Sequence, residues 1–435
     1  MRRRRGISFV IVLAVLTALV ALVAGFAATQ RSAVRESIGR GERLRARVLA
    51  EAGLQRGLAA LALVQQDRTE PTTLSDDWAT LGQNGAEEFS LASGSFRLQI
   101  VDASGLIDLN TAPEEALTNL GLTTEQVNSL LDWREAATTS NRADGGKDTY
   151  YNGLTTPYNA RLGRLQTVDE LLLVKGFTND TLYRAGVLNE NSTVATGVAP
   201  GETERPLADL ATVVAYAPND DPDGDGRLNV NTAANANAIA QRLGLQGQIP
   251  EAIFNGRPAG TGYATLGAVL NAPGVAGNTT AVRNILDRLN IVPGDRLEGK
   301  VNFNTAPVEV LAAIPGIGAD LAQTIVGRQS SSPFDKLSDL VDVSSQPQFT
   351  QAIATYAATR SASFLVRSVG KAGSTTIALT ATVVLADPTQ TAAGAGQAAP
   401  ARLLRVEEAP FGDMPTRWGW DDVTTTTSLQ EATTR

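Results

Sequence analysis

The sequence opens with MRRRRGISFVIVLAVLTALVALVAGFAATQR at residues 1–31, in which four arginines precede a long stretch without charge. This stretch, from Ile7 to Gln30, is long enough at about 1.5 Å of rise per residue to cross a hydrocarbon core of roughly 30 Å. The arginines before it favour a cytoplasmic N-terminus, with the rest of the chain beyond the membrane. A cleavable secretory signal is the alternative, although its apolar region usually spans only ~7–15 residues.

The segment that follows predicts a continuation of the same helix. Residues 32–66 contain no proline, and apolar residues recur among arginines and glutamates at helical spacing: Val34, Ile38, Leu44, Val48, Leu54, Leu58 and Leu61. Such spacing is typical of an amphipathic helix. Together with the apolar stretch, residues 7–66 predict one helix about 90 Å long.

Strand patterns flank the middle of the chain. Residues 95–101 alternate apolar and polar side chains, which predicts a strand. Residues 361–386 predict two strands around a hairpin turn bracketed by Gly370 and Gly373, and residues 401–408 predict another. The long region between these strands is therefore expected to be an insertion into a small sheet.

Three segments of this insertion share one pattern. They are GLIDLNTAPEEALTNLGLTTEQVNSLLDWR (105–134), GRLNVNTAANANAIAQRLGLQGQIPEAIFNGR (226–257) and GKVNFNTAPVEVLAAIPGIGADLAQTIVGR (299–328). Each has a short extended piece, Asn-Thr-Ala, a helix, a tight connection, a second helix and a closing arginine, and the threonines are expected N-caps. Three copies indicate internal duplication. The expected fold class is α+β, a pilin-like long helix with a small antiparallel sheet, plus a large all-α insertion of helix-hairpin-helix or SAM-like repeats.

The third copy contains a turn, Pro315-Gly316-Ile317-Gly318, that is typical of a helix-hairpin-helix. Hairpins of this class can hold a DNA phosphate at the start of the second helix, usually beside lysine or arginine. Here Asp320 follows the turn, and the chain has a formal net charge of −8. The carboxylate and the negative net charge both argue against nucleic acid as a partner. The alternative function, in which this hairpin does bind DNA, is a membrane-tethered DNA-binding protein of the competence type.

An acidic stretch, NDDPDGDGRLNVN at residues 219–231, resembles the first half of a calcium-binding loop. Asp221, Asp223 and Asp225 alternate, and Asn229 is a further candidate oxygen ligand, so calcium is a possible cofactor. The usual closing glutamate is missing, and a solvated acidic turn is the alternative. A weaker acidic group comprises Asp132, Asp144 and Asp148.

The chain contains no cysteine and no histidine. This composition excludes thiol chemistry, a Ser-His-Asp triad and the usual transition-metal ligands. We therefore expect a protein without catalytic residues.

The N-terminus resembles a type IV prepilin. In that family a prepilin peptidase cuts after a glycine, here Gly6, which would leave Ile7 as the first mature residue. The fifth mature residue is usually glutamate and is Ile11 here. A carboxylate is costly in lipid unless it pairs with the subunit above, so its absence suits a subunit at a filament tip.

The ordered set of motifs resembles the type II secretion system minor pseudopilin K family. The motifs are FRLQIVDASGLIDLNTA, LLDWRE, TYY, LQTVDELLLVKGFT, LADLATVVA, RLNVNTA and SASFLVRSVGKAG. The resemblance implies a non-catalytic tip subunit that starts pseudopilus assembly, supports protein export and binds the minor pseudopilins I and J. It also implies a single-pass inner-membrane protein with most of its chain in the periplasm. The residues expected to pack on partner helices are Ile11, Val34, Ile38 and Val48.

These patterns divide the chain into eight expected segments. They are a leader (1–6), the pilin helix (7–66), a connection with the first strands (67–104), three helical units (105–200, 201–298 and 299–360), the C-terminal strands (361–410) and a flexible tail (411–435).

Overall fold

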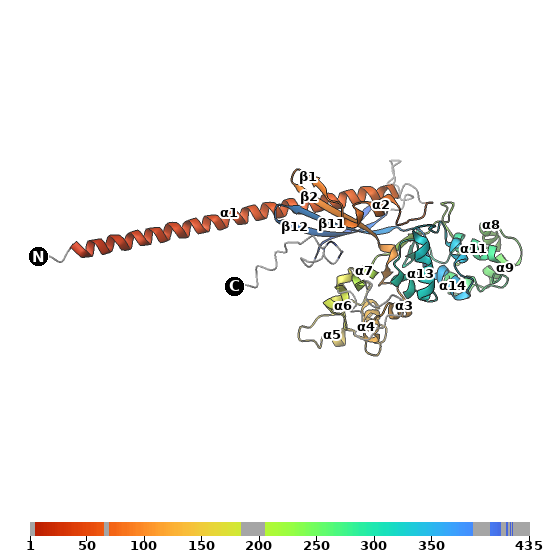
Figure 1. Ribbon diagram of the computed structural model, residues 1–435. Coiled ribbons are helices and arrows are strands. Elements are labelled where there is room, and N and C mark those ends of the chain that lie inside the picture. The colour runs from red at the N-terminus through yellow and green to blue at the C-terminus, as the bar shows by residue number, and fades with distance from the viewer. Residues whose placement is uncertain are drawn as a thin grey trace.

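We describe a computed structural model of the chain, in which residues 5–64, 69–183, 205–385 and 401–409, and residues 415, 418 and 420, are described. One helix, α1 (Arg5–Val64), spans 60 residues and projects away from the rest of the molecule (Figure 1). The single long helix predicted at the N-terminus is therefore confirmed. Residues 1–4 of the leader and nearly all of the expected tail lie outside the described residues.

An antiparallel sheet of five strands packs against the C-terminal part of α1, in the order β1-β2-β11-β12-β13. Side chains from α1, including Leu49, Leu54 and Leu61, form a core with the sheet residues Leu98 and Phe364. The predicted strands and the predicted α+β class are confirmed. The strands are β1 (Phe89–Leu91), β2 (Gly94–Asp102), β11 (Ser363–Ala372), β12 (Thr375–Val384) and β13 (Arg402–Glu408).

Gly370 is not at the hairpin turn, where the sequence predicted it. It lies inside β11, paired with Phe96 on one side and Ile377 on the other. A Cβ at this position would lie 2.1 Å from the carbonyl oxygen of Ala46 and 2.3 Å from the amide nitrogen of Ala50, both in α1. Glycine is needed here because the helix backbone lies directly on the strand. Gly373, with φ of 58°, occupies the turn.

Two tryptophans near the C-terminus pack on the sheet. Trp418 and Trp420 are buried and share a small cluster with Val369 and Ala378. The Trp420 indole nitrogen donates a hydrogen bond to the carbonyl of Asn84 at 2.8 Å. These two side chains are structural, as the sequence indicated.

The insertion forms a head, most of whose residues 226–358 lie beyond the end of the sheet farthest from the N-terminus of α1, while its first part lies beside the sheet, where Asp209 pairs with Arg367 of β11 (Figure 1). Its apolar residues make one continuous core from Ile107 to Ala357. Its first part contains β3 (Ile107–Asp108), α3 (Glu114–Asn119), α4 (Thr124–Arg134), α5 (Asp148–Tyr151), η3 (Val168–Leu173), α6 (Asn179–Tyr183), α7 (Leu207–Leu210) and β4 (Ala211–Thr212).

The remaining elements of the head follow in chain order. They are β5 (Tyr216–Pro218), β6 (Leu228–Asn229), α8 (Ala236–Leu243), α9 (Gln248–Asn255), α10 (Leu266–Val269), α11 (Thr279–Arg288), β7 (Leu289–Asn290), β8 (Arg296–Glu298), β9 (Val301–Asn302), α12 (Val308–Ala313), α13 (Gly318–Gln329), η4 (Leu337–Asp342), α14 (Pro347–Tyr356) and β10 (Ala357–Ala358). Short elements α2 (Asp77–Thr80), η1 (Gln83–Gly85) and η2 (Ala103–Gly105) surround β1 and β2.

The head is not purely helical, which corrects the expected all-α insertion. Each unit begins and ends with a two-residue strand, and the two strands pair in parallel: β3 with β4, β6 with β7, and β9 with β10. Strands this short carry no alternating pattern that a sequence could reveal. The first unit closes at Thr212 and therefore extends beyond residue 200.

The threonines of the three Asn-Thr-Ala motifs are not N-caps. The first helices of the units are capped by Pro113, Asn235 and Pro307, two or three residues later than expected. The motif instead forms a turn between the short strand and the helix.

Candidate functional site

The asparagine of each Asn-Thr-Ala motif holds its unit closed, and we call Asn110, Asn231 and Asn304 the clamp asparagines. The Asn110 Oδ1 accepts a hydrogen bond from the Leu165 amide at 2.7 Å. Its Nδ2 donates to the carbonyls of Leu165 and Val213, both at 3.0 Å. The same three bonds recur from Asn231 to Tyr263 and Ile291, and from Asn304 to Phe334 and Thr359.

A second polar residue two positions earlier fixes the turn. The side-chain oxygens of Asp108, Asn229 and Asn302 accept hydrogen bonds from the backbone amides of the three clamp asparagines at 2.9, 2.9 and 3.0 Å. Asn229 is therefore part of the second repeat, and its Oδ1 faces the Asn231 amide. This position corrects its expected role as a ligand of the acidic loop.

A side chain at the end of the second helix of each hairpin donates hydrogen bonds to backbone carbonyls of the Asn-Thr-Ala turn. Arg134 donates to the carbonyls of Leu109 and Ala112, and Arg257 makes equivalent bonds in the second unit. In the third unit Gln329 does this, with its Nε2 at 2.9 and 2.8 Å from the carbonyl oxygens of Phe303 and Ala306. Arg328, the expected closing residue, lies over the Phe334 ring instead.

A buried carboxylate joins the third unit to the sheet. Asp102, at the end of β2, is only 4% exposed. Its Oδ2 accepts hydrogen bonds from Asn302 Nδ2 at 3.0 Å and from the Ser361 and Thr305 hydroxyls at 2.6 Å each. Burial raises the pKa of Asp102 above its ordinary value, and these hydrogen bonds oppose that rise.

The acidic loop is an ion-paired turn. Asp221 is fully buried, and its Oδ1 accepts hydrogen bonds from the amides of Asp223 and Asp225, each at 3.0 Å. Arg242 lies 2.8 Å from Asp221 Oδ2 and 3.6 Å from Asp225, while Arg288 lies 2.8 Å from Asp223 and 3.6 Å from Asp221. The two guanidinium groups thus lie beside all three carboxylates.

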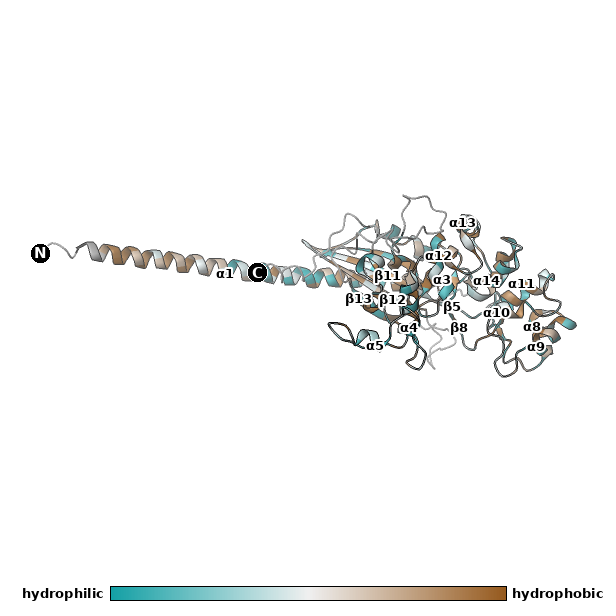
Figure 2. Cartoon of the chain, turned by 90° about the horizontal axis from the view of Figure 1, so that it is seen from below, coloured by the Kyte–Doolittle hydropathy of each residue, from teal (hydrophilic) through white to brown (hydrophobic). Residues whose placement is uncertain are grey.

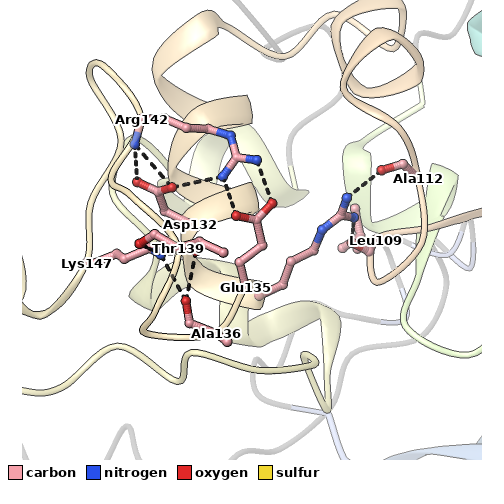
Figure 3. A network of polar contacts seen from close by, with 9 residues as sticks. Leu109, Ala112, Asp132, Glu135, Ala136, Thr139, Arg142 and Lys147 are labelled. Carbon is pink, nitrogen blue, oxygen red and sulfur yellow. Dashed lines mark hydrogen bonds and ion pairs between the residues drawn. The ribbon is translucent and has the colours of Figure 1, made fainter.

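The second acidic group is also neutralised within the protein (Figure 3). The Arg142 guanidinium lies between the carboxylates of Asp132 and Glu135, at 3.0 and 2.5 Å. The hydrogen bond from Arg142 lowers the pKa of Glu135. Asp148 accepts a hydrogen bond from the Ala160 amide at 2.8 Å, so it does not converge with Asp132 on one point.

These arrangements do not fit a calcium ion. A calcium site needs several carboxylate or carbonyl oxygens directed at one point about 2.3–2.6 Å away. In both groups an arginine side chain provides the positive charge instead. In the part of the chain that the structure describes, no cluster of three or more acidic side chains is arranged to hold a metal.

The hairpin turn packs into the head. Gly316 and Gly318 have φ of 87° and 71°, which favour glycine. A Cβ on Gly316 would lie 3.0 Å from the carbonyl oxygen of Gln348 in α14, so the turn is in close contact with that helix. Pro315 is half-buried, and Asp320 is exposed in the first turn of α13.

Residues 110–185, which fall within the first unit, match the family model for the type II secretion system (T2SS), protein K. Residues 298–351, the third unit, match the helix-hairpin-helix motif. The protein K model and this motif therefore fall on two copies of one clamped unit.

Two further comparisons were made beyond the protein K model. A search of curated proteins found no match. Among solved structures, the chain is similar to one chain of the GspK-GspI-GspJ complex from the type 2 secretion system of enterotoxigenic Escherichia coli. The two are 14% identical, with a TM-score of 0.44, and the match covers 86% of this chain and 100% of that chain.

The exposed part of α1 includes the residues expected to pack on partner helices. Gly6 and Ile7 lie in its first turn, and its N-terminal half is strongly apolar (Figure 2). It is the one described helix that is long and apolar enough to cross a membrane. Beyond this half, four exposed apolar residues, which we call the α1 stripe, lie within about 120° of the helix circumference: Val34, Ile38, Leu44 and Val48.

The α1 stripe faces away from the sheet. The buried apolar residues that α1 contributes to the core shared with the sheet are Ala46, Leu49, Ala50, Leu54 and Leu61. At about 100° per residue, the middle of the stripe lies roughly 150° around the helix from the middle of these positions, and Ile38 lies at the edge of the stripe, about 20° from Leu49. Ile11, also exposed, lies in the apolar half of α1.

Sequence reasoning missed Asp102 and the three clamp asparagines as key residues. The repeated Asn-Thr-Ala motif was the available signal for the clamps. A polar residue repeated in otherwise apolar surroundings is best explained by a buried hydrogen-bonding role.

We expect Asn304→Ala to lower the free energy of unfolding by at least about 2 kcal/mol, because three buried backbone groups would lose their partner. Thr324→Ala in the same unit is the control, since its exposed hydroxyl bonds only the Asp320 carbonyl. Denaturant unfolding of the full chain in detergent measures both. Equal effects of the two substitutions would contradict the role of the clamp.

We expect Arg242→Ala to destabilise the head by about 3 kcal/mol, because the buried carboxylate of Asp221 would lose its nearest cation. Arg164→Ala, which removes an exposed pair with Glu298, should cost less than about 1 kcal/mol. Thermal unfolding with excess Ca²⁺ or with a chelator should give the same midpoint for the unmodified chain. A higher midpoint in Ca²⁺ would mean that the acidic turn binds calcium after all.

Proposed function

We propose that the chain is a non-catalytic minor pseudopilin that occupies the tip of a type II secretion pseudopilus and starts its assembly there. In this role, α1 anchors the chain in the inner membrane, and the sheet and head lie in the periplasm. The observation that carries the proposal is the α1 stripe. Val34, Ile38, Leu44 and Val48 are each more than half exposed and face away from their own sheet, as an unpartnered packing surface would.

The shape of the molecule supports a position at the tip. The second and third units of the head extend beyond the end of α1, while the first unit lies beside the sheet (Figure 1). An insertion of this size would collide with neighbours stacked above it in a helical shaft. At a tip no subunit lies above it, which also agrees with Ile11 in place of a membrane carboxylate.

The partners that fit the α1 stripe are the minor pseudopilins I and J of the same system. Packing of apolar side chains along two or three parallel helices needs no catalytic or charged group. The known complex named among the similar solved structures contains GspK with GspI and GspJ, and we extend that combination to this chain as a proposal.

The DNA-binding alternative has less support from the third unit. Lys300 donates hydrogen bonds to the carbonyls of Ala354 and Thr355, and Arg328 lies over Phe334. Both basic residues of residues 299–328 are thus engaged inside the protein, and Asp320 occupies the first turn of α13. A phosphate at this helix start would meet a carboxylate rather than a cation.

We expect Ile38→Asp to abolish co-purification with pseudopilins I and J, because a carboxylate would have to be desolvated in the helix interface. The unfolding midpoint should not change, since residue 38 does not contact the sheet. Ser32→Asp, an exposed position on another side of the same helix, is the matched control and should leave the complex intact. Recovery of the complex with the Ile38 variant would rule out the stripe as the interface.

The proposal also predicts the processing of the N-terminus. A prepilin peptidase should cut after Gly6, so N-terminal sequencing of the membrane-extracted protein should begin at Ile7. A sequence that begins near Ala28 would instead indicate a secretory signal and would contradict the pilin-type anchor.

A further inference from the structure

The apolar half of α1 is followed by a hydrophilic segment of the same helix, and this segment is basic (Figure 2). Residues 31–47 hold six arginines and two glutamates, a net charge of +4, whereas residues 48–435 have a net charge of −16. The positive charge is thus confined to the part of the chain next to the apolar stretch. Basic residues beside a membrane-spanning segment are attracted to anionic lipids.

The two arginines closest to the apolar stretch, Arg31 and Arg35, have no acidic partner. Both side chains are exposed, and neither forms a hydrogen bond or an ion pair with another described residue. The next arginine along the helix, Arg40, is paired, with its guanidinium 3.0 Å from the Glu36 carboxylate. Arg31 and Arg35 are therefore available to an anion outside the chain.

The position of these two arginines along α1 matches the headgroup layer of a bilayer. The uncharged stretch of residues 7–30 is about 36 Å long, and a hydrocarbon core is roughly 30 Å thick. With the stretch centred in the core, the Cα of Arg31 lies about 4 Å beyond the hydrocarbon and that of Arg35 about 10 Å beyond it. Helical side chains lean toward the N-terminus of their helix, so both guanidinium groups lean back toward the lipid phosphates.

The two side chains can act on the same lipid. Arg31 and Arg35 are four residues apart, so they lie about 40° from each other on one side of the helix. A guanidinium binds phosphate oxygens through two parallel N–H groups, which makes arginine well suited to a phosphate ligand. Exposed charges are screened beyond about 8–10 Å, so Arg45, whose Cα lies about 25 Å beyond the hydrocarbon, is too far away to contribute.

We propose that Arg31 and Arg35 bind the phosphate group of an anionic phospholipid, such as phosphatidylglycerol, in the leaflet from which the sheet and head project. This inference rests on the membrane anchor of the proposed function. A zwitterionic phospholipid offers the same phosphate, but its choline group places a further positive charge close to both arginines. The contact with an anionic headgroup sets the depth at which α1 lies in the bilayer.

The test uses the full chain, which has no cysteine, with Ala28→Cys labelled by bimane and reconstituted in phosphatidylcholine vesicles. Ala28 lies three residues before Arg31 on the same side of α1, so a lipid held by the arginines places its acyl chains beside the label. Phosphatidylglycerol and phosphatidylcholine with brominated acyl chains, which quench bimane on contact, are added at equal mole fractions in separate samples. The apparent affinity for the site beside the label should be about threefold or more higher for phosphatidylglycerol.

Variants separate the two arginines from general effects of charge. Arg31→Gln combined with Arg35→Gln should remove the preference, so that both brominated lipids quench equally. Arg45→Gln is the matched control, because it removes an exposed arginine without an ion pair from the same side of α1, and it should keep the preference. NaCl at about 1 M, where the Debye length is about 3 Å, should weaken the preference.

Three outcomes would overturn the inference and leave the membrane anchor intact. They are equal quenching by the two lipids in the labelled parent, a preference that survives in the double variant, and a preference that is lost in Arg45→Gln. A chain that does not enter the vesicles at all would contradict the anchor itself, and the inference with it.

Discussion

Among the hydrogen bonds that join the head to the sheet, two from the third unit converge on one buried carboxylate, that of Asp102. The residue ends β2, and its carboxylate accepts from Asn302 of the third unit and from Ser361 at the entry to β11. Asn302 also donates to the Thr72 carbonyl at 3.0 Å, which brings in the chain that follows α1. The N-terminal connection, the sheet and the third unit therefore meet at this carboxylate. Its burial is tolerated because both carboxylate oxygens accept hydrogen bonds that offset the lost hydration.

The three units of the head have the same internal contacts between the start and the end of each unit, although their surface residues differ. In each unit a parallel pair of two-residue strands joins the start of the unit to its end. The clamp asparagine, in the turn after the first strand, forms hydrogen bonds with the backbone of two residues later in the unit. Residues outside these contacts have diverged, so that the first copy matches a protein K model and the third a helix-hairpin-helix model. Side chains that satisfy buried backbone groups are hard to replace, because their loss leaves several groups unpaired at once.

The two acidic groups show how tertiary contacts override a local motif. The spacing of Asp221, Asp223 and Asp225 is compatible with a cation, although the glutamate that usually closes such a loop is missing. The neutralising residues Arg242 and Arg288 come from α8 and α11, far along the chain. Local patterns contain no information about such partners.

The sequence by itself determined the elements whose signals are local. The length and hydropathy of residues 7–66 specify one helix, alternation specifies the strands, and the repeated Asn-Thr-Ala motif indicates duplication. The tertiary structure alone decided the role of Gly370, because the need for glycine comes from the backbone of α1 above it. It also decided that Gln329 rather than Arg328 closes the third unit, and that arginines neutralise the acidic turn. These outcomes depend on distances between residues that are remote in sequence, which periodicity and spacing cannot encode.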